Sequence, residues 1–415
     1  FRRVLFRSKD LANTLEAIAQ RGPDAFYKGK IPAAVEAAAK KGGELLTAKD
    51  FADYRISETA PLTCSYRGYK FVSSPPPSSG GTTLCETLNI LEGYNLKEMG
   101  FNSAASVHVL TEAMRHAYMD RNTYLGDPAF VTNPIGRLTS KSYAGEIRKQ
   151  IDPERATPSK QVQPGMMPHE KPETTHYSIV DQQGNAVSTT YTVNGRFGAV
   201  VIAPGTGFFL NDEMDDFTTK VGEQNLYGLV QGSRNAIAPG KRPLSSMSPS
   251  LVTKDGKIFL VLGSPGGSRI ISITLQAAIN IIDYGMAPQE AVDAPRIHHQ
   301  WLPDEVYYEQ RGLSADTLAL LLKHGADPCL RDKRGNSALM GAIFKGEVRI
   351  ARTLIAAPCN PDQRNNAGQT AAMYASLFQR TELLKALADK GADMQATDAL
   401  GNSVTSLGQG EIRGR

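Results

Sequence analysis

The spacing of apolar residues changes several times along this chain, and each change predicts a different kind of element. Over residues 9–60 apolar positions recur three and four residues apart, as in 11–19, and predict helices. Residues 61–73 alternate apolar and polar side chains and are rich in β-branched and aromatic residues, which predicts a strand or hairpin. Helical periodicity returns at residues 82–91 and 103–118. The first part of the chain is therefore expected to be mainly helical around one region of strand.

A run rich in proline and glycine, residues 73–81, separates the hairpin from the next helix. Its composition suits a linker, but a helix follows it at once, so a tight strand-to-helix turn is the alternative. The helix at 103–118 carries Glu112, Arg115 and His116, which we expect to form a solvated or ion-paired face. Residues 150–173 lack periodicity and hold several prolines and many polar groups, which predicts an exposed, mobile segment. Such a segment is a suitable place for a chain to be cut.

From residue 174 onward the pattern changes to strands. Short strands separated by turn residues are predicted at 177–180, 186–193, 197–202 and 208–210. A continuous apolar strand at 258–262 is suited to burial on both faces. It leads through the turn Gly263–Ser268 into a buried helix at 270–282. A strand, a glycine turn and a helix in this order place backbone N–H groups where they can bind an anion or stabilise an oxyanion.

Near residue 313 a period of 33 residues begins. Two sets of residues share it: Gly335, Gly368 and Gly401 each follow a polar turn, and Leu321, Leu354 and Leu387 occupy one register. A unit of helix, turn, helix and β-turn with this period resembles the ankyrin repeat, here over about residues 313–407. The Thr-Pro-Leu-His signature of that repeat is degenerate, as Ser337–Met340 and Thr370–Met373.

Composition narrows the function classes. A chain of 415 residues with 41% hydrophobic and 21% charged residues is typical of a globular protein of two or three domains. The net charge is only +4 and no basic stripe with interleaved aromatics occurs, so nucleic-acid binding is not indicated. The sequence has no run of apolar residues long enough to predict a membrane span. The four cysteines, Cys64, Cys85, Cys329 and Cys359, are widely spaced, and we expect free, mostly buried thiols rather than a disulfide framework or a zinc site.

The stretch Lys171–Asp181 holds a candidate nucleophile. It places Thr174 and Thr175 between the polar segment and an apolar strand. A threonine hydroxyl is a poor nucleophile without a base, and an N-terminal threonine can use its own α-amine, which titrates near ~8. That chemistry requires cleavage of the Glu173–Thr174 bond. The alternative is that the two threonines simply begin a strand, which threonine favours.

Five further motifs follow Thr174 along the chain. They are Thr192–Asn194, the acidic turn Asn211–Phe217, Tyr227–Val230, the serine-containing run Lys241–Pro249 and the glycine turn Ser264–Arg269. Each motif alone has an ordinary structural explanation as a cap, a solvated turn or a glycine turn. Together with Pro75–Gly81, Tyr124–Pro128 and Ala294–Pro303, the set closely resembles the γ-glutamyltransferase (γ-glutamyl transpeptidase) family, from about residue 9 to residue 321.

This resemblance implies an N-terminal-nucleophile hydrolase, an α+β protein with a four-layer αββα core. The family precursor cuts itself before the residue that matches Thr174, which gives a large and a small subunit and makes Thr174 the catalytic nucleophile. Thr174 would take the γ-glutamyl group from glutathione and pass it to water or to an amino-acid or peptide acceptor, without a cofactor or a metal. The other implied roles are Thr192 beside the nucleophile, Gly266 and Gly267 in the oxyanion hole, Asn194, Glu213 and Asp216 at the α-amino end, Ser245 and Ser246 at the α-carboxylate, and Tyr227 in a lid loop.

The resemblance also sets the expected domains. They are a leader at 1–8 that we expect not to be native, the C-terminal part of a large-subunit region at 9–173, a small-subunit region at 174–321, ankyrin-like repeats at 322–407 and a tail at 408–415. The first half of the family's large subunit, with the arginine that clamps the substrate α-carboxylate, has no counterpart here. The repeats also stand where the last strands of the small subunit would follow. We therefore expect a truncated core with reduced or absent activity on glutathione, made either by a fusion or by the joining of two unrelated pieces.

Two other functions stay open. The working part could be the ankyrin-like array, which would bind a protein partner beside an inactive enzyme remnant. The chain could also be another self-processing amidase, such as an acylase, although an acidic Asp216 favours a glutamyl substrate that bears an α-amino group. His298 and His299 are expected to be structural, because adjacent residues do not share a helical face. The compartment is not predicted, since the first eight residues lack the apolar region of a secretory signal, whereas the family suggests a periplasmic or extracellular protein.

Overall fold

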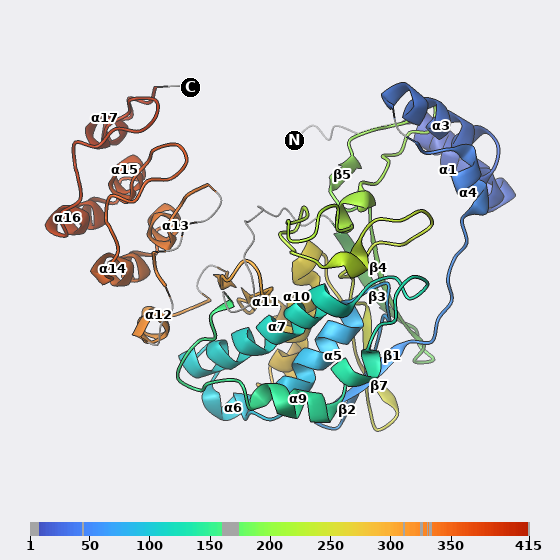
Figure 1. Cartoon of the computed structure of the whole chain (residues 1–415), viewed down its shortest axis with the longest axis horizontal. Coiled ribbons are helices and arrows are strands. Elements are labelled where there is room, and N and C mark those ends of the chain that lie inside the picture. The colour runs from blue at the N-terminus through green and yellow to red at the C-terminus, as the bar shows by residue number, and fades with distance from the viewer. Residues whose placement is uncertain are drawn as a thin grey trace.

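The computed structural model describes residues 8–43, 45–159, 174–309, 312–323, 327–329, 331 and 334–413. A group of N-terminal helices, a layered central part and a C-terminal set of helices follow one another along the chain (Figure 1). The N-terminal helices are α1 (Lys9–Arg21), α2 (Asp24–Tyr27), α3 (Lys30–Gly42) and α4 (Ala48–Asp53). Their presence confirms the helical prediction for this region.

An antiparallel sheet of four strands forms the middle of the central part. Its order is β1-β2-β6-β7, with β1 at Leu62–Tyr66, β2 at Tyr69–Ser73, β6 at Ser250–Lys254 and β7 at Lys257–Leu262. The β1–β2 hairpin was predicted, but its pairing with β6 joins segments far apart in sequence, with Ser73 opposite Ser250. The prediction that β7 is buried on both faces is wrong: Ile258 and Phe259 are exposed, because β7 is the edge strand of this sheet in the described part of the chain.

Helices cover one face of this sheet and form the main hydrophobic core with it (Figure 1). The three long ones are α5 (Gly80–Leu91), α7 (Ala104–Tyr124) and α10 (Ile270–Ile282), and the shorter ones are α6 (Leu96–Met99), α8 (Ile135–Leu138), α9 (Lys141–Arg148) and α11 (Pro288–Asp293). Helix α10 has its predicted bounds, whereas α7 continues past residue 118. Because α5 begins at Gly80, the proline-rich run at 73–81 is a tight strand-to-helix turn and not a linker.

Two charged residues of α7, Glu112 and Arg115, are ion-paired but not solvated. Glu112 and Arg115 are both buried, and Arg115 pairs with Glu112 at 3.3 Å and with Asp304. The backbone N–H of Thr157 also donates to Glu112, at 3.0 Å, so the largely exposed stretch after residue 150 is tied to the core. The rest of the predicted mobile segment, residues 160–173, lies outside the described residues.

A second, two-stranded sheet packs against β6 and β7. It is the hairpin of β3 (Thr174–Val180) and β4 (Ala186–Thr192), followed by the short strand β5 (Arg196–Ala199). The predicted strand near residue 208 is reduced to a single bridge between Ile202 and Phe209. Ile179, Val187 and Tyr191 on the outer face of the hairpin are 53%, 50% and 56% exposed, respectively. The described residues therefore form three of the four expected layers, in the order helix, sheet, sheet.

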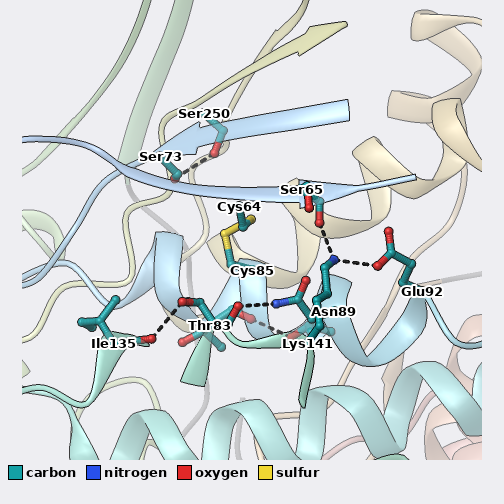
Figure 2. Close-up of a disulfide and its surroundings, with 12 residues drawn as sticks. Cys64, Ser65, Ser73, Thr83, Cys85, Asn89, Glu92, Ile135, Lys141 and Ser250 are labelled. Atoms are coloured by element: carbon teal, nitrogen blue, oxygen red, sulfur yellow. Dashed lines mark hydrogen bonds and ion pairs between the residues drawn. A yellow bond between two sulfur atoms is a disulfide. The ribbon is translucent and has the colours of Figure 1, made fainter. Parts of the chain in front are cut away.

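Both pairs of cysteines form disulfide bonds, so the expectation of free thiols is wrong. Figure 2 shows Cys64 on β1 bonded to Cys85 on α5, with Cα atoms 6.0 Å apart. Cys329 and Cys359 are bonded in the C-terminal helical region, with Cα atoms 5.4 Å apart. The spacing along the sequence gave no sign of either bond, because packing of separate elements brings each pair together.

The C-terminal region is helical and repeats in space. Its helices are α12 (Ala315–Lys323), α13 (Ala338–Lys345), α14 (Val348–Ala356), α15 (Ala371–Leu377), α16 (Thr381–Asp389) and α17 (Val404–Gly408). Ser337, Thr370 and Ser403 cap α13, α15 and α17, and the caps are spaced by the predicted 33 residues. Helix α12 joins this region to the central part, since Leu318 belongs to the second core and Leu321 packs against the first. None of the described helices is both long enough and apolar enough to cross a bilayer.

Candidate active site

The two threonines that sequence reasoning singled out lie side by side. Thr174 is the first residue of β3 and Thr192 is the last residue of β4, and the two are directly paired in the antiparallel register. The Thr174 hydroxyl donates to the Thr192 hydroxyl oxygen at 3.3 Å. Both side chains are half-buried at the open end of the hairpin. Glu173, the residue before the expected cleavage point, lies outside the described residues.

Asn194 connects this pair to the acidic turn. Its backbone N–H donates to the Thr192 hydroxyl at 2.9 Å, and its side-chain amide donates to the carbonyl of Asp212 at 3.2 Å. The backbone of Asn194 is left-handed, with φ 71°, a conformation that asparagine tolerates better than most residues. This bend turns the chain from the end of β4 toward the turn that holds Glu213 and Asp216.

Tyr227 connects Asn194 to the glycine turn. Its phenol donates to the side-chain oxygen of Asn194, and its ring lies directly on Gly267, where an added Cβ would be 2.4 Å from the ring. The side-chain amide of Gln300 donates to the carbonyl of Tyr227 at 3.0 Å. Tyr227 is buried, so the predicted lid residue is packed into the site.

The predicted oxyanion turn has the backbone of a donor site. Gly266 has φ 140° and Gly267 has φ 54°, so both need the freedom of glycine, and the 3₁₀ turn Gly267–Arg269 leads straight into α10. Within the described residues, no group accepts a hydrogen bond from the N–H of either glycine. Ser268 fixes the turn, because its carbonyl accepts from the Tyr118 phenol and its hydroxyl donates to Gln300, both at 2.6 Å.

The acidic turn carries two carboxyl groups with raised pKa values. Burial and the nearby Glu213 raise the pKa of Asp216 to about 8. Burial and Asp212 raise the pKa of Glu213 to about 7. The backbone of Asp216 is held by side-chain amides of Gln231 and Asn235, which donate to its carbonyl at 3.3 Å and 2.7 Å. Among the described residues, no cationic side chain lies within ion-pair distance of Asp216 and no donor reaches its carboxyl group.

The predicted serine pair, Ser245 and Ser246, is hydrogen-bonded to the strand-to-helix turn at residues 73–81. The carbonyl of Ser245 accepts from the backbone N–H and the hydroxyl of Ser79, at 2.8 Å and 2.6 Å. The Ser246 hydroxyl accepts from the guanidinium of Arg121 at 3.0 Å. Asn235 accepts from the backbone N–H of Leu244 at 3.0 Å and so joins the serine loop to the acidic turn.

Sequence reasoning missed Tyr118, Arg121 and Gln300. Arg121 lies four residues after Ala117 and eight after Ala113, on the same buried face of α7. An arginine at helical spacing from small buried residues indicates a buried charge, and this pattern is visible in the sequence. Apolar periodicity fades after residue 118, so it does not predict a helix as far as Arg121. Gln300 lies in an extended segment, just after the short strand β8 (Ile297–His298), which pairs with β9 (Tyr307–Tyr308). No local pattern marks it.

His298 and His299 are both buried and hydrogen-bonded. His298 contacts the hydroxyl of Ser272 at 2.8 Å, and His299 accepts from the backbone N–H of Trp301 at 3.1 Å. Burial lowers the pKa of these two imidazoles to about 3 and about 4. Both rings are therefore neutral parts of the core, and the described residues contain no cluster of three or more metal-ligating side chains.

Comparison with known proteins places this site in a family. The family model of gamma-glutamyltranspeptidase matches residues 3–368. The chain belongs to the gamma-glutamyltranspeptidase family. The match includes the candidate site residues and also overlaps the first C-terminal helices, beyond residue 321 where the motif resemblance was expected to end.

The curated relatives that match this chain include glutathione hydrolase proenzymes. A glutathione hydrolase proenzyme of Pseudomonas sp. (strain A14) is 58% identical over 317 residues, which are 76% of this chain and 55% of the relative. A glutathione hydrolase proenzyme of Escherichia coli (strain K12) is 51% identical over 340 residues, which are 82% of this chain and 58% of the relative. The chain thus spans about half the length of the gamma-glutamyltranspeptidase relatives it matches.

A solved structure supports the fold. The crystal structure of cephalosporin acylase from Bacillus halodurans matches with a TM-score of 0.63 and 29% identity, over 77% of this chain and 55% of that one. The mixed helix and strand architecture is therefore that of an N-terminal-nucleophile hydrolase neighbour. Because this structural neighbour of the gamma-glutamyltranspeptidase family member is an acylase, another self-processing amidase remains the alternative function.

Proposed function

We propose that this chain carries out γ-glutamyl acyl transfer and hydrolysis of glutathione and related compounds, with Thr174 as nucleophile after self-cleavage at the Glu173–Thr174 bond. The observation that carries the proposal is the in-register pair of Thr174 and Thr192, with hydroxyl oxygens 3.3 Å apart. Cleavage would release the α-amine of Thr174, which can take the hydroxyl proton. The large- and small-subunit regions would then be residues 9–173 and 174–321.

The proposed reaction has two acyl-transfer steps. The Thr174 oxygen attacks the γ-carbonyl carbon, the amide C–N bond breaks, and the leaving amine takes the proton held by the α-amine. Water or an amino acid then attacks the resulting ester and restores the threonine hydroxyl. The N–H groups of Gly266 and Gly267, which have no acceptor among the described residues, support a role in binding the oxyanion of each tetrahedral intermediate. All of these steps use side chains and backbone alone.

The site would recognise the α-ammonium and the α-carboxylate groups of the γ-glutamyl substrate with different residues. Asp216 and Glu213 suit the α-ammonium group, with Asn194 beside them, and the hydroxyls of Ser245 and Ser246 suit the α-carboxylate. Tyr227 would close over this end, since it contacts both Asn194 and Gly267.

A chromogenic γ-glutamyl anilide tests this function. We expect the purified chain to release the aniline, and we expect Thr174→Ala to release none. No release by the wild-type chain at high concentration, in a preparation shown to be folded, would reject the activity.

A second candidate is a different self-processing amidase. The favouring observation is that an acylase ACY 1 proenzyme of Pseudomonas sp. (strain SE83) is 43% identical over 69% of this chain. The two candidates differ at the α-amino group, which an amidase for other acyl chains does not need. Comparing hydrolysis of γ-glutamyl and glutaryl anilides separates them, since the glutaryl group lacks only that amine. We expect the γ-glutamyl compound to be preferred.

The C-terminal helices support a separate proposal of an ankyrin-like array that binds a protein partner. The support is the spacing of the caps at Ser337, Thr370 and Ser403 together with the left-handed glycines at 335, 368 and 401. A pull-down with residues 315–413 deleted from the bait tests it, with loss of partner as the expected result.

A further inference from the structure

Arg121 is enclosed in the core, with no counter-ion among the described residues. Its side chain is 1% exposed and lies on the face of α7 that packs toward the strand-to-helix turn. The guanidinium donates to the hydroxyl of Ser79 at 2.8 Å, the side chain of Asn122 at 2.8 Å, the hydroxyl of Ser246 at 3.0 Å and the carbonyl of Leu244 at 3.4 Å. In the part of the chain that the structure describes, no carboxylate comes within ion-pair distance of it.

A buried charge without an ion-pair partner destabilises the fold. We therefore ask what Arg121 does in this position. Every acceptor around Arg121 is neutral. The nearest influence of opposite charge is Asp216, which is close enough for each to shift the pKa of the other but too far for an ion pair. Among the described residues, the site thus holds one cation, Arg121, and one acid, Asp216, that have no ion-pair partner.

The hydrogen bonds of Arg121 decide which way the serine hydroxyls can act. Arginine only donates, so the Ser246 oxygen uses a lone pair to accept from it. The Ser246 proton is then left to donate, and no described residue accepts it. The Ser245 hydroxyl likewise accepts a hydrogen bond, from the backbone N–H of Met247 at 3.1 Å, and no described residue accepts its proton. Each hydroxyl therefore keeps a proton that no described residue accepts, and two such donors can bind a carboxylate.

Arg121 also holds the backbone of this pair. Its second hydrogen bond is to the hydroxyl of Ser79, and that hydroxyl donates to the carbonyl of Ser245 at 2.6 Å. One guanidinium therefore fixes both serines, Ser246 directly and Ser245 through Ser79. A lysine in the same place would keep the charge but could not make this fork.

We propose that Arg121 is a positioning residue for the amino-acid end of the substrate: it orients Ser245 and Ser246 as carboxylate donors and supplies the buried positive charge that favours an α-carboxylate there. The guanidinium does not touch the ligand, because it is buried behind the serines. This proposal rests on the proposed function, since it names the group that the site recognises and how the chain is built to recognise it.

Three small ligands separate this role from a purely structural one. L-Glutamate has the α-ammonium and the α-carboxylate, glutarate lacks the ammonium, and 4-aminobutyrate lacks the α-carboxylate. Binding is measured by calorimetry for the wild type and Arg121→Lys. We expect Arg121→Lys to weaken L-glutamate and glutarate alike, by roughly 10- to 100-fold, and to leave 4-aminobutyrate unchanged.

Arg115→Lys is the matched control, because Arg115 is buried on the same helix but pairs with Glu112 and Asp304 away from the serines. Arg115→Lys should lower the melting temperature but leave the relative affinities for the three ligands as they are in the wild type. Where Arg121→Lys does not fold, Ser79→Ala takes its place, since it removes one arm of the fork and leaves the charge; it should weaken the two carboxylate-bearing ligands by about 5-fold.

The outcomes distinguish the two proposals. Equal loss for all three ligands, or no loss in folded Arg121→Lys, would overturn the role of Arg121 and leave the proposed function standing. A folded wild-type chain that binds none of the three ligands would overturn the proposed function and the role of Arg121 together.

Discussion

The hydroxyl of Thr174 lies 3.3 Å from the hydroxyl of Thr192, across the open end of the β3–β4 hairpin. The register of the hairpin sets this contact, because a slip of one residue would turn Thr192 to the opposite face. The backbone N–H of Asn194 holds the Thr192 oxygen from the other side. Thr192 is therefore fixed in place before any ligand arrives.

Replacing Thr192 by alanine should act on the chemical step. We expect kcat to fall by about 10-fold or more with little change in KM, since the contact orients the nucleophile and does not touch the γ-glutamyl group. Steady-state kinetics with the γ-glutamyl anilide measures it. Thr189→Ala is the control, because Thr189 lies on the same strand but faces the other side of the hairpin. A fall of equal size in both variants would show a general effect on the hairpin.

Gly267→Ala should damage the oxyanion turn for two reasons. The residue has φ 54°, and an added Cβ would meet the Tyr227 ring at 2.4 Å. We expect activity to fall by about 100-fold, the scale of losing one oxyanion donor. Gly256→Ala shares the positive φ but meets no atom within 4 Å, so it should cost about 1 kcal/mol of stability and keep its activity. Similar activities for the two variants would argue against this role for Gly267.

The local elements of this chain were readable from its sequence. Helix α10, the β1–β2 hairpin and the 33-residue period of the C-terminal helices each follow from patterns within a short window. Local patterns also made Thr174 and the glycine turn at Gly263–Ser268 candidates, whereas the other candidate site residues came from a resemblance. The structure connects them through contacts from Thr174 to Thr192, Asn194, Tyr227 and the glycine turn.

What the sequence hid depends on packing between distant segments. The Cys64–Cys85 bond needs β1 to lie against α5, and the pairing of β2 with β6 joins residues on either side of the candidate cleavage point. The exposure of Ile258 and Phe259 likewise reflects the position of β7 at a sheet edge, which an apolar run does not reveal. Arg121 looked like an ordinary charged residue because its partners, Ser79 and Ser246, lie far from it in sequence.

Asp216 should make stability depend on pH. Its pKa in the folded chain is about 8, raised by burial and by Glu213, against about 3.9 when unfolded. The folded state then binds more protons between these values, so its contribution to stability is complete below pH ~4 and is lost as the pH rises through about 8.

We therefore expect Asp216→Asn to be more stable than the wild type at pH 8.5, by about 1–2 kcal/mol, and to bind L-glutamate more weakly. Urea unfolding at pH 5 and pH 8.5 measures the first effect. Glu223→Gln, at an exposed site, should leave the pH dependence of the wild type unchanged. An unchanged pH dependence in Asp216→Asn would contradict the raised pKa.

Removing the Cys64–Cys85 bond should destabilise the central part. The two cysteines are 21 residues apart, and a crosslink over a loop of this size contributes about 3 kcal/mol to the free energy of unfolding. Cys64→Ala with Cys85→Ala should lower the free energy of unfolding by about that amount, which is measured as a lower urea midpoint than that of the wild type. Cys329→Ala with Cys359→Ala should instead affect the C-terminal helices. An unaltered midpoint in the first double variant would show that the bond does not form in solution.

The central claim is that Thr174 cuts the chain at its own N-terminal side. Intact mass spectrometry of the purified wild-type chain tests it most directly. We expect two fragments, residues 1–173 and 174–415, with a free threonine amine on the second, and a single uncut mass for Thr174→Ala. An uncut wild-type chain, or a Thr174→Ala chain cut at the same bond, would contradict it.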